Sequence, residues 1–250
     1  MPHDDGAHPS VEQAHAKAYV LTTPSRPFLE ALARVAGPQR LAVAKRLQAD
    51  ATVKDGIAGW GLLDEAAAFK LLQYAGRQMC EELGYEPPTM KVQPGVIANR
   101  AGLYDDASDT LAINAELLKT RSAYSALATV LHEVRHAIQH RIVAATQTDN
   151  DLVTLAAGYK ARPAAGNPAA YGDYVHLTTE FDAFQFGNCV ASILSKGKFD
   201  DTQFGTVDTH FDAKGLVIFD LLNLPAELDL KGRILAVNVA EADALGLIVN

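Results

Sequence analysis

The stretch 131–140 reads LHEVRHAIQH and contains an H-E-x-x-H motif, formed by His132, Glu133 and His136. On an α-helix, residues four apart lie nearly one above the other, so both imidazoles can face the same metal ion. Glu133 is rotated by about 100° from His132, which lets it reach a water molecule at the metal rather than the metal itself. The spacing therefore predicts a metal site on a helix.

The residues around the motif favour a long, buried helix. Neither Pro nor Gly interrupts the segment 122–147. Apolar residues recur at helical spacing on the adjoining face: Leu127, Val130, Leu131, Val134, Ile138 and Ile142. The motif alone also arises by chance, in which case His132 and His136 would be ordinary core or surface histidines. Its position on a long amphipathic helix favours the metal site.

The composition is that of a globular protein. The chain has 250 residues and a formal net charge of −8, and 48% of its residues are hydrophobic, which is enough to bury a core without disulfides. No basic patch is visible, so we expect no nucleic-acid partner. No apolar run is long enough to cross a bilayer, so we expect no membrane partner. Cys80 and Cys189 lack a C-x-x-C partner and are expected to be small buried apolar residues.

The N-terminal region has no basic segment leading into an apolar stretch, the pattern of a secretory signal. We therefore expect cytoplasmic action, although delivery by a specialised secretion machine would leave no such trace. Residues 1–26 are polar and rich in turn formers, which predicts a flexible tail. Residues 27–88 are predicted to form a helical region. Within it, Gly37 and Pro38 are expected to divide the first helix, residues 53–63 to form a loop, and Asp64 to cap a helix.

A metal-binding core is predicted over residues 89–196. Its first part contains short β-like pieces at 90–98 and 102–104, an aspartate-rich turn at 105–109, and an alternating segment, Thr110–Asn114. These features predict a small antiparallel sheet with Thr110–Asn114 at an edge. The turn lacks the Gly and the distant Glu of a twelve-residue calcium loop, so a calcium site is not expected there.

Beyond the motif helix, residues 152–159 are predicted to form a short helix. The segment 162–174 is rich in Pro, Gly, Ala and Asn and is expected to form a loop over the site. A further helix is predicted from 178 or 179 to about 195. We expect residues 197–250 to form a mixed or β-rich extension packed on the core.

A catalytic zinc site usually has three protein ligands, so a third must be found outside the motif. His140 continues the series of residues four apart, but the accumulated rotation makes it a poor ligand, and we expect it at the surface or beside a ligand. Glu180 is the better candidate. On a helix it shares one face with small residues that would allow close approach to the motif helix: Ala183, Gly187 and Ala191.

Asp182 lies about 200° round the same helix from Glu180, so the two cannot bind one ion while the helix is regular. We expect Asp182 to orient a ligand histidine or to cap the helix. The alternative for Glu180 is that it fills an N-terminal position where the helix dipole favours acids.

H-E-x-x-H followed by E-x-x-A on a later helix resembles the gluzincin zinc metallopeptidases, in particular the compact minigluzincins. The pieces G-L-Y-D and T-L-A-I-N are similar to the hairpin that precedes the motif helix in that group. The resemblance covers about residues 90–195. It implies zinc held by His132, His136 and Glu180, with Glu133 as the catalytic base. The transition-state donor is usually a Tyr or His in this family, and three residues are candidates by proximity: Tyr171, Tyr174 and His176.

The sequence thus predicts an α+β, zincin-like domain with extra N-terminal helices, acting as a zinc metallopeptidase on a peptide or protein substrate. Thr110–Asn114 would offer an edge to which an extended substrate adds as a strand. Three alternatives stay open: a zinc-bound, catalytically silent binding module, a hydrolase of non-peptide amides, and a secreted effector or toxin protease. The oligomeric state is not predicted.

Overall fold

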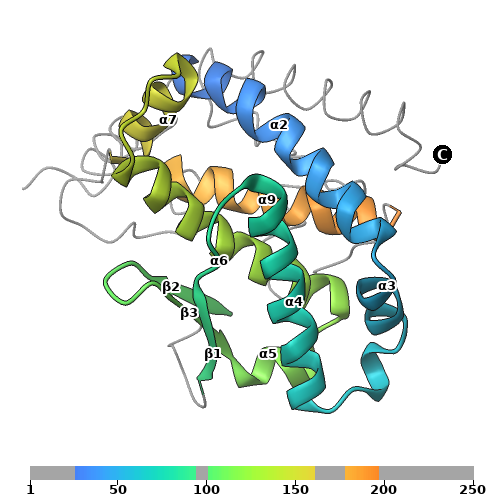
Figure 1. The fold of residues 1–250 in the computed structure, drawn as a ribbon. Helices are drawn as coiled ribbons and strands as arrows, with labels where there is room; N and C mark the ends of the chain where they lie inside the picture. The colour runs from blue at the N-terminus through green and yellow to red at the C-terminus, as the bar shows by residue number, and fades with distance from the viewer. Residues whose placement is uncertain (1–25, 94–100, 161–177, 197–250) are drawn as a thin grey trace, which may run out of the picture.

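The computed structural model describes residues 26–93, 101–160 and 178–196. These residues form an α+β fold that is mostly helical, with one three-stranded sheet. The elements in chain order are α2 (Arg26–Ala49), α3 (Ala51–Ala58), the 3-10 helix η1 (Trp60–Leu62), α4 (Glu65–Leu83), β1 (Thr89–Gln93), β2 (Gly102–Asp105), β3 (Thr110–Asn114), α5 (Ala115–Thr120), α6 (Ala123–Ala144), α7 (Asn150–Lys160) and α9 (Thr178–Leu194). In Figure 1, α6 and α9 occupy the middle, with α2 and α7 above and the strands below at left.

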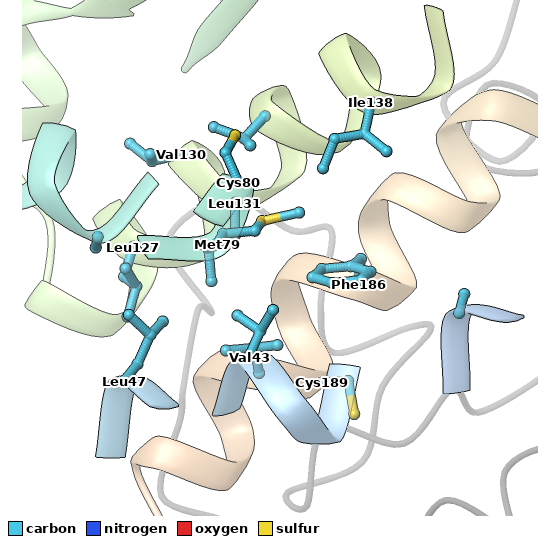
Figure 2. Packing of buried hydrophobic residues seen from close by; sticks show 14 of the residues in the cluster. Val43, Leu47, Met79, Cys80, Leu127, Val130, Leu131, Ile138, Phe186 and Cys189 are labelled. Carbon is cyan, nitrogen blue, oxygen red and sulfur yellow. The ribbon is translucent and has the colours of Figure 1, made fainter. Parts of the chain in front are cut away.

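The motif helix α6 is the central element of the core. Its N-terminus is capped by Ser122, whose side chain accepts a hydrogen bond from the Ser125 backbone N–H. It packs against α4, α7 and α9 and contacts β2. The apolar face predicted from the sequence is buried along its whole length. Figure 2 shows its side chains meeting those of α2, α4 and α9; the labelled residues are Val43, Leu47, Met79, Cys80, Leu127, Val130, Leu131, Ile138, Phe186 and Cys189.

The sheet is mixed, so the expected antiparallel sheet is wrong. Its strand order is β1-β3-β2, with β3 antiparallel to β2 and parallel to β1. Thr110–Asn114 is therefore the central strand and not an edge. Its three middle residues, Leu111, Ala112 and Ile113, are all buried, as both faces of a covered central strand should be. The aspartate-rich turn and the family resemblance indicated the β2–β3 hairpin, but neither shows which side of β3 receives β1.

The helix α2 is continuous, so the break expected at Gly37 and Pro38 is wrong. Pro38 lies inside the helix on its exposed side. A proline there removes one backbone hydrogen bond and strains the helix by about 3 kcal/mol. Apolar side chains on both sides of it are fully buried, Phe28 before and Leu47 after, among others. Burial of apolar side chains in both halves of α2 offsets the cost of the proline.

The loop expected at 53–63 is also wrong, because α3 and η1 occupy most of it. Asp50 caps α3 by accepting a hydrogen bond from the Val53 backbone N–H at 3.0 Å. Gly56 lies inside α3, where a Cβ would stand 2.6 Å from methyl groups of Leu71. The glycine thus permits close packing against α4 and does not break the helix.

Other expectations are confirmed. Asp64 caps α4 by accepting from the Ala67 backbone N–H, and Gly84 ends the helix at φ 74°. The short helix expected at 152–159 is α7, and the helix expected from 178 or 179 is α9. Cys80 and Cys189 are buried and free.

The helices of 27–88 and the elements of 89–196 contribute to one cluster of buried apolar residues. The predicted tail, 1–26, apart from Arg26, and the predicted extension, 197–250, lie outside the described residues. Among the helices of the described ranges, none has the length and apolar character needed to cross a membrane.

Candidate metal centre

The two motif histidines and Glu180 lie together, as the sequence predicts. The Nε2 atoms of His132 and His136 are 3.0 Å apart. Oε2 of Glu180 lies 3.2 Å from Nε2 of His132 and 3.4 Å from Nε2 of His136. These three residues are close enough to hold a metal ion. Their side chains are mostly shielded from solvent.

The arrangement of these atoms fits a metal ion. Ligand atoms around a tetrahedral ion at about 2.0–2.1 Å are about 3.3–3.4 Å from one another, close to the three separations found here. Oε2 of Glu180 is buried and has no hydrogen bond of acceptable geometry among the described residues, although two ring nitrogens are nearby. The atoms therefore converge on a common point without forming hydrogen bonds of good geometry to the carboxylate. Two imidazoles and a carboxylate are a donor set suited to divalent transition metals.

Glu180 reaches the histidines because α9 approaches α6 very closely. The closest approach is at Gly187, where a Cβ would lie 2.4 Å from the Ala128 carbonyl oxygen and 3.2 Å from the His132 backbone nitrogen. Ala183 and Ala191, on the same face, are fully buried. The small residues that share a face with Glu180 thus allow the close approach of α9 to α6 that the sequence predicted.

The charges of the cluster are strongly coupled. Burial alone would lower the pKa of His136, but the adjacent Glu180 carboxylate raises it to about 9. Burial alone would raise the pKa of Glu180, but His136 and then His132 hold it well below its ordinary value. In the metal-free protein, Glu180 is therefore an anion beside a cationic His136, an arrangement that a metal ion would replace.

Glu133 does not belong to the ligand cluster and points towards β2. A Cβ added to Gly102 would lie 2.8 Å from Cγ and 3.1 Å from Oε1 of Glu133, so only glycine leaves room for this side chain. The Tyr104 backbone N–H lies near enough to lower the pKa of this carboxylate slightly. Burial raises the pKa of Glu133 against the lowering effect of His132 and His136. Sequence reasoning missed Gly102, although a glycine opening a strand is a signal of close approach.

Asp182 lies outside the candidate cluster, as the sequence predicts. Its Oδ2 accepts hydrogen bonds from Nε of Arg135 at 2.7 Å, from the Tyr159 hydroxyl at 2.8 Å and from Nε2 of Gln139 at 2.9 Å. Burial opposes its ionisation, but the Arg135 guanidinium holds the pKa of Asp182 below its ordinary value. Sequence reasoning missed Arg135, Tyr159 and Gln139. An arginine inside the motif of a buried helix was the available signal, since it requires a buried partner.

The remaining candidates lie elsewhere. The His140 side chain is 40% exposed and lies 3.5 Å from Asp106 in the turn between β2 and β3, outside the ligand cluster. This agrees with the surface position expected for it. Tyr171, Tyr174 and His176, with the whole predicted loop over the site, lie outside the described residues.

Comparison of the chain with protein-family models, curated proteins and solved structures gives no match, so the function rests on the geometry and chemistry of this site.

Proposed function

We propose that this protein is a zinc-dependent metallopeptidase of the gluzincin type, with a zincin-like core around α6. One observation carries the proposal. His132, His136 and Glu180 converge on one point, and a fourth group, the Glu133 carboxylate, lies beside the histidines without joining the cluster. A purely structural metal site has no need of that additional buried carboxylate.

The donor set favours zinc, because two histidines and a glutamate with one position left for water are typical of catalytic zinc sites. When bound, zinc would polarise a substrate carbonyl and lower the pKa of water towards neutrality. The chain's own contribution is to hold three ligands from two helices in a buried setting.

Glu133 is the general base in this proposal. The pKa of Glu133 is raised towards neutral pH, where a general base must both accept and return a proton. The carboxylate lies against β2, beside Gly102 and near the Tyr104 backbone N–H. From there it would take a proton from the attacking water and deliver it to the leaving amine.

Because β3 is the central strand, we place the substrate-binding edge on β2 instead. The Asn114 N–H donates to the Ala101 carbonyl at 3.0 Å, and antiparallel pairs alternate between bonded and non-bonded. The backbone groups of Gly102 and Tyr104 therefore face away from β3, on the side where Tyr104 meets Glu133. An extended peptide adding to this edge would pass beside the base.

The test combines metal analysis of the purified protein with cleavage of a broad peptide library. The parent should carry about one zinc per chain and cleave peptides. Glu133→Gln keeps the shape but cannot accept a proton, so it should retain zinc while hydrolysis falls by about a hundredfold to ten-thousandfold. Glu116→Gln, on the exposed surface of α5, is the matched control and should cleave like the parent.

Two results would contradict the proposal. Equal cleavage by the parent and Glu133→Gln would remove Glu133 from the mechanism. A zinc-loaded parent that cleaves no peptide or protein would instead support a binding module.

A further inference from the structure

Gln139 lies one helical turn after His136 on α6 and is almost fully buried. Its Oε1 lies 2.9 Å from Nδ1 of His136. Its Nε2 lies 2.9 Å from the Thr179 backbone carbonyl oxygen and 2.9 Å from Oδ2 of Asp182. One amide side chain thus connects a candidate metal ligand on α6 to two groups on α9.

The chemistry of these neighbours determines how the amide is oriented. A backbone carbonyl and an ionised carboxylate both accept hydrogen bonds, and neither can donate one. Asp182 is ionised, since Arg135 donates to it from a fully buried position. The amide nitrogen of Gln139 must therefore face Thr179 and Asp182, because the flipped amide would place its oxygen against two acceptors. Oε1 is left facing His136.

An amide oxygen accepts only, so Nδ1 of His136 must carry the hydrogen in this contact. The lone pair of a neutral His136 ring then lies on Nε2. That is the atom 3.4 Å from Glu180 and 3.0 Å from His132, at the point where the three candidate ligands converge. The other histidine differs, because Nδ1 of His132 has no hydrogen-bond partner among the described residues.

We propose that Gln139 is a positioning residue that fixes the tautomer and orientation of His136, and that Asp182 acts on His136 through Gln139. The inference rests on the metal site of the proposed function but not on peptide hydrolysis. The sequence suggested that Asp182 orients a ligand histidine, and the contacts make that action indirect. The Arg135 and Tyr159 contacts hold Asp182 in place, so the buried network supports the site through a single amide.

The test replaces Gln139 with Met, which has a similar size and helix preference but cannot form these hydrogen bonds. Zinc affinity should fall about tenfold to a hundredfold. Gln185→Met is the matched control. Gln185 is also buried, lies on α9, and accepts a hydrogen bond from Arg40 at 3.0 Å. This variant should bind zinc like the parent, and thermal unfolding of both variants should show that they are folded.

A second measurement needs no variant. In the zinc-loaded parent with nitrogen-15 in its histidines, NMR should place the ring hydrogen of His136 on Nδ1 and protect it from exchange with water. In Gln139→Met this hydrogen should exchange faster, and in Gln185→Met it should not. A parent with the His136 hydrogen on Nε2 would overturn the inference. So would a Gln139→Met variant with unchanged affinity and exchange.

The two proposals fail differently. A parent that binds zinc with the expected tautomer but cleaves nothing contradicts only the peptidase. A parent that cleaves peptides, with Gln139→Met binding zinc as tightly, contradicts only the role of Gln139.

Discussion

The backbone of Gly187 lies against the Ala128 carbonyl so closely that a Cβ would stand 2.4 Å from that oxygen. This contact sets the distance between α6 and α9, and therefore the distance between the motif histidines and Glu180. Gly187→Ala should push the helices apart, because a backbone oxygen cannot move aside as a flexible side chain can. We expect a loss of about 1–3 kcal/mol in the free energy of unfolding and weaker zinc binding, measured by denaturation and metal titration.

The control for Gly187→Ala is Gly61→Ala, since a Cβ at Gly61 meets nothing within 4 Å. This variant should bind zinc like the parent. Equal zinc affinity and stability for Gly187→Ala and the parent would show that the helices do not need this close contact.

The third ligand is tested by comparing Glu180→Ala with His140→Ala. Glu180→Ala removes one of three converging donors and should weaken zinc binding by orders of magnitude. His140→Ala removes a half-exposed side chain outside the cluster and should leave affinity unchanged. Metal titration of folded variants measures both. Loss of zinc from His140→Ala with retention by Glu180→Ala would disprove the ligand assignment.

Zinc binding should release a proton from His136 at neutral pH. The pKa of His136 is about 9 in the metal-free protein, so its ring is protonated at pH 7 and must lose that proton to become a ligand. Apparent affinity should therefore rise about tenfold per pH unit as pH approaches 9, and then level off. Glu180 does not contribute to this pH dependence, because its pKa is lowered and it is already ionised.

Calorimetric titrations at pH 7, in buffers of different ionisation enthalpy, count the released protons. His140→Ala should release as many as the parent. Affinity that does not change between pH 7 and pH 9 would contradict the charged state assigned to His136.

The buried pair of Arg135 and Asp182 should matter far more for stability than a similar pair at the surface. Asp182→Ala leaves a fully buried guanidinium without its carboxylate, and should lower the free energy of unfolding by about 3–5 kcal/mol. Asp151→Ala breaks a two-bond pair with Arg34, whose side chain is 58% exposed, and should change little. Chemical denaturation measures the free energy of unfolding of both variants, and losses of similar size would contradict this prediction.

The sequence predicted most of the candidate site because its information is local. H-E-x-x-H fixes the relative directions of His132, Glu133 and His136 by helix geometry alone. Glu180 could be found because the small residues on its face, Gly187 among them, show where a helix can approach another backbone. The partners of Arg135 escaped prediction. An arginine on a buried helix indicates a buried partner, but Asp182 and Tyr159 lie on α9 and α7, far along the chain.

The errors in the fold arise from long-range packing. The order of strands depends on which segment pairs with the far side of β3, and alternation within Thr110–Asn114 does not specify this. Pro38 and Gly56 are helix breakers by local preference, yet the helices α2 and α3 continue through them. Burial of apolar side chains on both sides outweighs that preference at Pro38, and at Gly56 the absence of a side chain lets α3 pack closely against α4.

Because its ligands come from α6 and from α9, an ion at this site would be a reversible crosslink. It would tie the segments that carry His136 and Glu180 together, and the link would exist only while the folded chain holds the ligands in place. Free metal at a thousand times its dissociation constant would add about 4 kcal/mol to stability. A chelator would remove the crosslink, so the melting temperature should rise with the concentration of free metal and fall when the ion is taken away.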